Sequence, residues 1–159
     1  MKIKHFEAWW VRIPIAAADQ HRSDFGQITT FDAAILRVET DDGIVGWGEG
    51  KNAAGSAGTY GALVHMLNHE VGPQLIGRDP RDIGDIWEFL YNGVRHHSAK
   101  LSGHAMPQLS RRGLSMAAIS AVDLALWDIL GKSLGVPVWR LLGGRKTERM
   151  KAYASGGWA

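Results

Sequence analysis

The sequence predicts an α+β fold, with strands in its first third, helices in its middle and a lone strand near its end. Apolar and polar residues alternate in stretches up to residue 50, the pattern of half-buried strands. From Tyr60 onward, apolar residues recur every three to four positions, which is the period of an amphipathic helix. A β-patterned segment at 150–157 has no partner strand near it in the sequence. A run of strands followed by a run of helices is typical of α+β domains.

Three strands are expected to form a small antiparallel sheet. Residues 3–13 alternate loosely until Pro14 stops the pattern. Two further β-patterned stretches within 33–50 flank Asp42-Gly43, a pair that adopts left-handed turn conformations readily, so we predict a hairpin. Between these strands, residues 16–31 are polar and lack periodicity. We therefore predict a long loop there, of the kind that serves as a lid or a binding loop.

Three helices are expected after the sheet. The first carries apolar positions from 60 to 71 and is predicted to end at Gly72-Pro73. The second begins at Asp79-Pro80, an N-cap acid followed by a proline in the first turn. It is expected to turn four side chains inward: Ile83, Ile86, Trp87 and Leu90. The third and longest runs over 114–134 and ends at Gly135, since glycine readily takes the left-handed conformation that closes a helix.

Length and composition indicate one domain with its own core. The chain has 159 residues, of which 45% are hydrophobic. Its 18 basic and 16 acidic residues give a net charge of +2, which does not point to nucleic acid or an anionic membrane as a partner. The absence of cysteine excludes disulfides and thiolate metal sites. We find no signal peptide and no apolar run of the ~20 residues that span a bilayer. We therefore expect a soluble, cytoplasmic protein.

The longest predicted helix contains two carboxylates, Asp123 and Asp128, among mainly apolar residues. Residues five apart on a helix project about 140° from one another, so these two cannot both ligate one metal ion. Asp128 precedes Lys132 by four positions, the favourable order for an ion pair. We interpret both carboxylates as structural, each satisfied by a local or neighbouring partner, because a buried charge persists only when it is paired.

Other motifs suggest sites only weakly. His65 and His69 have the spacing of a metal-ligating pair, but they face away from the apolar side of their helix and no third ligand is near. The polar, irregular stretch 93–113 contains further histidines without ligand spacing, for which we favour surface or subunit contacts: His96, His97 and His104. The glycine-rich runs at 46–50 and 143–147 lack the spacing of nucleotide-binding and phosphate-binding loops.

The better candidates for ligand contacts lie in the long predicted loop. His21, Arg22 and Asp24 place a titratable ring, a bidentate anion binder and an acceptor within four residues. This set suits an acidic or polyhydroxylated ligand, although polar residues are also ordinary in loops, and both interpretations stay open. Trp158 follows the last predicted strand, where it could line a pocket or pack, and composition alone favours packing.

Two motifs resemble a known family. The stretch AISAVDLALWDILGK at 118–132, continued by PVWRLLG at 137–143, resembles the signature of the mandelate racemase/muconate lactonizing branch of the enolase superfamily. The hairpin RVETDDGIVGWGEG at 37–50 resembles the N-terminal domain of the same family. The resemblance implies that residues 1–115 form an α+β capping domain. Residues 116–159 would begin a (β/α) TIM-type barrel, truncated after a first strand near 150–155, since a whole barrel takes about 250 residues.

The resemblance also implies a chemistry. In such enzymes a lysine or histidine removes the proton α to a substrate carboxylate, and Mg²⁺ held by acidic barrel residues stabilises the enediolate. The resemblance implies that no catalytic residue and no metal ligand lies in this chain, because the matching motifs are expected downstream of Ala159. It makes His21, Arg22 and Asp24 candidate substrate contacts, with Trp158 at the barrel rim.

The function implied is that of a Mg²⁺-dependent acid-sugar dehydratase or mandelate-racemase-like enzyme. The polar loop at 16–31 favours a hydroxylated acid, so we expect the partner to be a small carboxylate substrate. We also expect a homo-oligomer that binds neither nucleic acid nor a membrane. One alternative is a muconate-lactonizing-type cycloisomerase or epimerase. Another, from a different class, is a non-catalytic α+β binding or assembly module that has no barrel.

Overall fold

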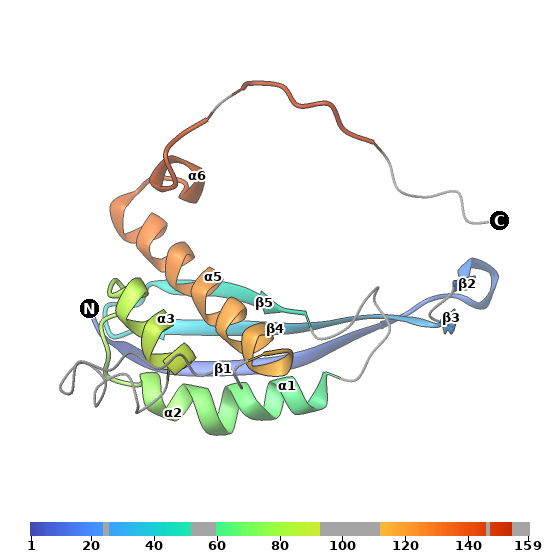
Figure 1. The fold of residues 1–159 in the computed structure, drawn as a ribbon, viewed down its shortest axis with the longest axis horizontal. Coiled ribbons are helices and arrows are strands. Elements are labelled where there is room, and N and C mark those ends of the chain that lie inside the picture. The colour runs from blue at the N-terminus through green and yellow to red at the C-terminus, as the bar shows by residue number, and fades with distance from the viewer. Residues whose placement is uncertain (24–25, 52–59, 93–111, 146, 154–159) are drawn as a thin grey trace.

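The computed structural model contains a three-stranded antiparallel sheet with helices packed on one face (Figure 1). The structure describes residues 1–23, 26–51, 60–92, 112–145 and 147–153. The strand order is β1-β4-β5, so β4 is the central strand. The three strands are β1 (Ile3–Pro14), β4 (Thr30–Thr40) and β5 (Val45–Gly50). The expected three-stranded antiparallel sheet is therefore confirmed.

The predicted long loop contains a second, smaller hairpin. A short 3-10 helix, η1 (Ala17–Asp19), leads into β2 (His21–Ser23), which pairs antiparallel with β3 (Gly26–Ile28). Strands of three residues are too short to show an alternation in the sequence, which is why the pattern missed them. This hairpin lies at the far end of the sheet (Figure 1).

Beyond β5 the sheet narrows to a two-stranded ribbon. The pairing of β1 with β4 continues to Pro14 opposite Thr30, whereas β5 begins its pairing with β4 only at Ala34. The ribbon therefore extends past the three-stranded part, and it carries the β2–β3 hairpin at its tip (Figure 1).

A continuous helical rod runs alongside β1. It consists of α1 (Gly61–Met66), a π-helical turn (η2, Leu67–Val71) and α2 (Gly72–Leu75). In the π-helical turn the N–H of Gly72 donates to the carbonyl of Leu67, five residues back. Pro73 then falls in the first turn of α2, where the missing N–H of proline breaks no hydrogen bond. The predicted end of the helix at Gly72-Pro73 was therefore wrong.

The next helix, α3 (Ile83–Asn92), begins later than predicted. The side chain of Asp79 accepts a hydrogen bond from the N–H of Arg81 at 3.0 Å, which makes a turn before the helix rather than its cap. The predicted inward positions Ile83, Ile86 and Leu90 are buried. Trp87 is a correction, because it is 39% exposed and stacks on Tyr91 with ring centroids 5.0 Å apart.

The longest helix, α5 (Leu114–Leu134), has the predicted bounds. Gly135 takes a left-handed φ of 67°, and the N–H of Val136 donates to the carbonyl of Gly131 at 2.9 Å, as in a Schellman cap. A short helix, α6 (Val138–Leu141), follows. Residues 150–153 are the described part of the strand predicted near 150–155, and they have no regular structure. A barrel strand needs hydrogen-bonded neighbours, and the described part of the chain offers none there.

By length and composition α5 could also cross a membrane, although the sequence patterns did not suggest it. Half of its most apolar window, 50%, is buried inside the protein. A buried core helix passes the same test of length and hydropathy. The packing of α5 against β5 is that of a core helix.

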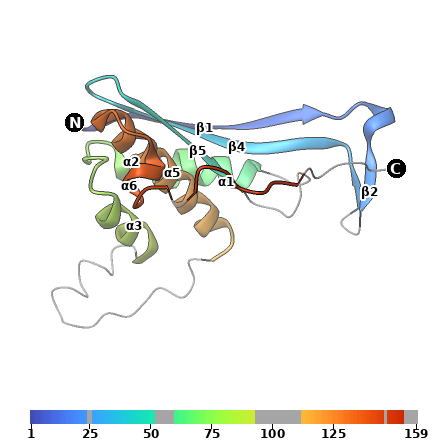
Figure 2. The same ribbon diagram turned by 90° about the horizontal axis from the view of Figure 1, so that it is seen from above.

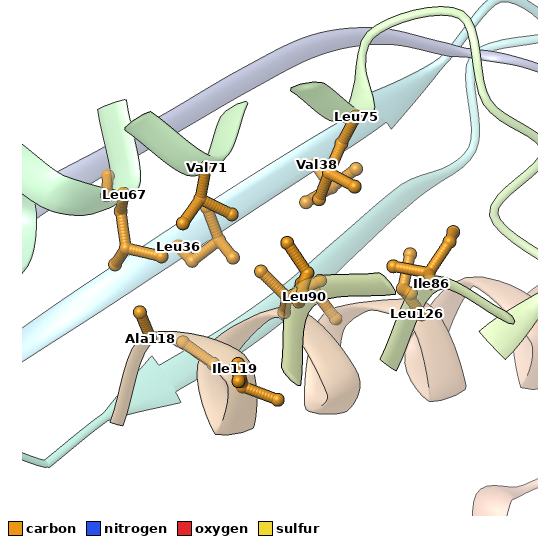
Figure 3. Packing of buried hydrophobic residues seen from close by; sticks show 14 of the residues in the cluster. Leu36, Val38, Leu67, Val71, Leu75, Ile86, Leu90, Ala118, Ile119 and Leu126 are labelled. Carbon is orange, nitrogen blue, oxygen red and sulfur yellow. The ribbon is translucent and has the colours of Figure 1, made fainter. Parts of the chain in front are cut away.

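The core lies between the inner face of the sheet and the helices (Figure 3). Leu36 and Val38 of β4 point from the sheet toward side chains of the helical rod, α3 and α5 (Figure 3). These partners are Leu67, Val71, Leu75, Ile86, Leu90, Ala118, Ile119 and Leu126, all buried. One contiguous hydrophobic cluster thus joins the sheet to the helical rod, α3 and α5.

The glycines of β5 allow α5 to lie directly on the strand. A Cβ atom placed on Gly48 would lie 1.9 Å from the carbonyl oxygen of Ala121, and one on Gly46 would lie 2.2 Å from that of Ala125. No side chain fits at such separations, so the glycine-rich run at 46–50 is explained by packing.

Side chains from the helices close both outer edges of the sheet. On β1, the amide of Asn68 accepts from the N–H of Ala8 at 2.8 Å and donates to its carbonyl at 2.9 Å. On β5, Asp128 Oδ2 accepts from the N–H of Trp47 at 2.9 Å, and Lys132 Nζ donates to the carbonyl of Val45 at 2.7 Å. Unpaired edge groups invite association with other strands, so these contacts protect the sheet.

Candidate functional site

The β2–β3 hairpin carries two of the four residues that the sequence singled out. His21 pairs with Ile28 and Arg22 with Gln27 in the antiparallel register. Arg22 is exposed. The hairpin bends toward the side of the sheet on which the helices lie (Figure 2). The structure thus places both residues in one polar hairpin, next to the end of the ribbon that extends past the three-stranded part of the sheet.

The remaining candidates lie outside the described residues. These are Asp24 and Trp158 of the proposed substrate contacts and the histidines His96, His97 and His104. A role in substrate binding for His21, Arg22, Asp24 or Trp158 stays a prediction.

A buried carboxylate on the ribbon gathers three donors. The side chain of Asp32 is 1% exposed and lies opposite Arg12 in the register of β4 and β1. Its Oδ1 accepts from Trp10 Nε1 at 3.0 Å and from Arg12 Nε at 3.2 Å, and its Oδ2 accepts from Thr30 Oγ1 at 2.8 Å. The guanidinium carbon of Arg12 lies 4.8 Å from the ring centroid of Trp10. We call Trp10, Arg12, Thr30 and Asp32 the ribbon cluster.

The charge of Asp32 is stabilised by these contacts. Burial by itself would raise the pKa of Asp32, but the hydrogen bonds from Thr30 and Trp10 and the charge of Arg12 outweigh it. The pKa of Asp32 is therefore lower than its usual value, and the carboxylate is ionised at neutral pH. Arg12 in turn keeps 56% of its side chain exposed, so one end of the ion pair is buried and the other meets solvent.

Sequence reasoning did not single out the ribbon cluster, although a signal was present. The alternation of residues 3–13 places Trp10 and Arg12 on the same face of the first strand. Asp32 is a charged residue at the start of the next long strand, and only the register shows that it faces Arg12. A charged residue on the inner face of each of two adjacent strands is the signal that could have identified the pair.

The two aspartates of α5 have different environments. Asp128 pairs with Lys132 at 2.7 Å and bonds the edge of β5, so the predicted structural role of Asp128 is confirmed. Asp123 borders a narrow apolar groove between α3 and α5, together with Trp87 and Leu90. Burial raises the pKa of Asp123 above its usual value. No partner for its carboxylate occurs among the described residues, so a satisfied Asp123 stays a prediction.

The described residues supply no metal site. Within the ranges that the structure describes, no three His, Asp or Glu side chains lie close enough together to hold an ion. His65 and His69 face each other with ring centroids 4.5 Å apart, and both are exposed on the helical rod. Two exposed imidazoles alone do not make the closed coordination shell of a structural site. Ligands for the implied Mg²⁺ remain an expectation for residues downstream of Ala159.

The sequence profile of the N-terminal domain of mandelate racemase / muconate lactonizing enzyme matches residues 6–143. The chain belongs to the mandelate racemase/muconate lactonizing enzyme family. The match covers the sheet, the helical rod and α5, and it confirms the family that the two quoted motifs predicted. Membership in the enolase superfamily is confirmed with it. The expected boundary between a capping domain at 1–115 and a barrel segment at 116–159 stays a prediction.

Relatives in the family include enzymes of sugar-acid metabolism. A D-galactonate dehydratase of Variovorax paradoxus is 44% identical over 120 residues, which is 76% of this chain and 27% of that protein. A solved enolase-superfamily protein from Polaromonas sp. JS666 has a TM-score of 0.74 and 33% identity, covering 100% of this chain and 37% of its own.

A racemase with a bound metal is also among the similar structures. A racemase from Streptomyces coelicolor with bound magnesium has a TM-score of 0.71 and 26% identity, covering 90% of this chain and 36% of its own. The chain therefore spans well under half the length of these similar proteins.

Proposed function

We propose that this chain is the capping part of a Mg²⁺-dependent acid-sugar dehydratase. The observation that carries the proposal is the similarity to D-galactonate dehydratases, at 44% identity over 120 residues for the Variovorax paradoxus enzyme. The polar hairpin that contains His21 and Arg22 is consistent with a hydroxylated, acidic ligand. Of the predicted contacts, Asp24 and Trp158 are part of the same proposal.

The proposed reaction removes water from a sugar acid. The C–H bond next to the carboxylate breaks, hydroxide leaves the neighbouring carbon as water, and the enol product becomes a 2-keto-3-deoxy acid. A bound Mg²⁺ would supply the charge that stabilises the enediolate. The described residues include no ligands for that ion, so their proposed part is to hold the sugar chain and exclude water.

A racemase is the second candidate, because the Streptomyces coelicolor racemase shares the fold at a TM-score of 0.71. Both reactions begin with removal of the same α-proton, and they differ in whether the substrate then loses water or regains a proton. An epimerase would begin in the same way but act on a peptide. A cycloisomerase would instead add a carboxylate across a double bond of a diene diacid, and the enolate formed would then take up a proton. The non-catalytic module has no support among the relatives, which are enzymes.

We also expected a homo-oligomer and, from the composition, a cytoplasmic protein, and we retain both expectations as proposals. The outer face of the sheet supports the first, because large apolar side chains are exposed on it: Trp9, Val11, Ile13, Phe31 and Trp47. An apolar patch of this kind marks a contact surface more often than a solvated one.

The proposal is tested by incubating the full-length protein and Mg²⁺ with a panel of five- and six-carbon aldonates, including D-galactonate. Formation of a 2-keto acid that stops on chelation of the metal and resumes on addition of Mg²⁺ is the expected result. Inversion at the α-carbon without loss of water would instead support the racemase. Consumption of muconate or a dipeptide, with no sugar acid altered, would overturn the dehydratase.

A further inference from the structure

His65 and His69 form a pair of imidazole rings on the exposed side of the helical rod. Their ring centroids lie 4.5 Å apart with 39° between the ring planes, and both side chains are exposed. Residues four apart lie on one side of a helix, and two histidines at this spacing can bind one metal ion. Within the described ranges, neither ring takes part in a hydrogen bond or an ion pair, so the ring nitrogens are open to a ligand.

The separation of the two rings fits a particular coordination geometry. A ring nitrogen bound to a metal lies about 2.1 Å from the ion, and the centre of its ring lies about 1.2 Å further out. Two such rings at a right angle have their centres about 4.7 Å apart, whereas tetrahedral ligands would have theirs about 5.4 Å apart. The observed 4.5 Å therefore matches adjacent ligands of a tetragonal or square-planar ion, the geometries typical of Ni²⁺ and Cu²⁺.

The helical rod holds the two rings in position. Asn68 lies between them in the sequence, and it bonds both backbone groups of Ala8 and so fixes the rod to β1. The opposite side of the rod is anchored in the core by Leu63 and Leu67, both fully buried. A site on an element that is already ordered loses little conformational entropy when an ion binds.

The sequence of the rod favours a cation at this pair. Among residues 60–75, Glu70 is the only side chain with a formal charge when the histidines are neutral, and it follows His69 directly. A nearby carboxylate attracts a metal ion, and the rod contains no lysine or arginine that would repel one. The rod itself therefore offers a cation attraction without repulsion.

We propose that His65 and His69 together bind one transition-metal dication that prefers nitrogen ligands at right angles, such as Ni²⁺ or Cu²⁺. A closed structural site needs more protein ligands than the described residues provide, so water completes the shell of this open, two-ligand site. The simpler interpretation, a solvated polar face, does not require the two rings to face each other at the distance of a chelating pair. The inference goes beyond the proposed function and does not rest on it.

The test titrates the full-length protein with NiCl₂ by calorimetry, with Mg²⁺ in excess to occupy sites that prefer oxygen ligands. The variants are H65Q and H69Q, and both are expected to fold because glutamine is a good helix former. H5Q is the matched control, since His5 is also exposed but its ring contacts Glu7 at 3.2 Å. The wild type and H5Q are expected to bind Ni²⁺ equally. H65Q and H69Q should each weaken the tightest binding about tenfold or more, because the second ring binds an ion already held by the first.

A second measurement reports whether the ion binds the folded rod. NiCl₂ is expected to raise the Tm of the wild type and of H5Q, because an ion that binds only the folded state stabilises that state. H65Q and H69Q should have the Tm of the wild type without metal and should show a smaller rise when NiCl₂ is added.

Three outcomes would overturn the inference. If H65Q and H69Q bind Ni²⁺ as tightly as the wild type does, the pair is not a site. If only one of the two substitutions weakens binding, a single histidine is the ligand and the pair does not chelate. If Mg²⁺ in excess removes all Ni²⁺ from the wild type, oxygen ligands hold the ion and the assignment is wrong. These outcomes do not depend on whether sugar acids are dehydrated, so the proposed function stands or fails separately.

Discussion

Asp128 of α5 accepts a hydrogen bond from the backbone N–H of Trp47 in β5 at 2.9 Å, although the two residues are 81 positions apart. The same Oδ2 atom pairs with Lys132, whose ammonium reaches the carbonyl of Val45. A carboxylate in a mainly apolar helix thus joins the long helix to the edge of the sheet as a clamp.

Removal of this clamp should destabilise the domain. D128A leaves the Trp47 N–H and Lys132 without their partner, so we expect the free energy of unfolding to fall by about 1–2 kcal/mol. D128N keeps an acceptor and should lose less. Urea unfolding of the full-length protein measures both. The control D85A removes an exposed ion pair with Arg78 at 3.5 Å and an acidic residue in the first turn of α3, and it should cost less than D128A. Equal losses in D128A and D85A would contradict the clamp.

Two glycine substitutions should have opposite effects on stability. G48A places a Cβ atom 1.9 Å from the Ala121 carbonyl oxygen, so α5 and β5 must separate, at a cost of about 3 kcal/mol or more. G84A meets no atom within 4 Å in helix α3 and should stabilise by roughly 0.5–1 kcal/mol through helix propensity. Thermal unfolding of the two variants distinguishes them. A tolerated G48A would show that the close helix–strand contact is not required.

The other edge of the sheet gives a parallel prediction. N68A removes both hydrogen bonds to Ala8 and should lower the free energy of unfolding by about 1–3 kcal/mol. N68D keeps the acceptor for the Ala8 N–H but sets a carboxylate against the Ala8 carbonyl, so it should not restore stability. Q74A, on the exposed side of the same rod, is the control. Denaturant unfolding measures these stabilities. If N68D proves as stable as the wild type, the prediction is wrong.

Asp123 should make stability depend on pH. Its pKa is raised by burial from the usual 3.8, so the folded state holds the proton to a higher pH than the unfolded state. Stability should therefore decline as the pH rises from about 3.8 through the folded pKa. D123N removes this loss, so it should stabilise at neutral pH and have little effect at about pH 3. Urea unfolding at the two pH values tests this, and an equal gain at both would refute it.

Asp32 should behave in the opposite sense. Its folded pKa is lowered, so its contribution to stability is present above the usual value of 3.8 and is lost as the pH falls through the folded pKa. D32N should destabilise most at neutral pH, and the difference from the wild type should shrink in acid. D123N and D32N together thus report two pKa shifts of opposite sign in one protein.

Local sequence patterns predicted the features that depend on neighbouring residues. The alternation of residues 3–13, the Asp42-Gly43 turn and the glycine that ends α5 each depend on backbone preferences within a few positions, and the structure has all three. The continuation of the helical rod through Pro73 could not be foreseen. It depends on a π-helical turn and on the contact of Asn68 with a strand 60 positions away.

The candidate site was predictable only in part for the same reason. The polar residues of 16–31 were visible in the sequence, but their hairpin depends on the ribbon that carries it. Arg12 and Asp32 are 20 positions apart and are brought together by strand register. Trp87 was expected inside because its spacing suits a buried face, yet the groove between α3 and α5 leaves it 39% exposed.

The central claim is that the whole protein removes the α-proton of a sugar acid and then eliminates water. Proton NMR of D-galactonate in D₂O with the full-length protein and Mg²⁺ tests it most directly. The expected result is loss of the C2 proton signal together with the appearance of a 2-keto-3-deoxy product. An unchanged spectrum for D-galactonate and for every other aldonate of the panel, under conditions where the protein is folded, would contradict it.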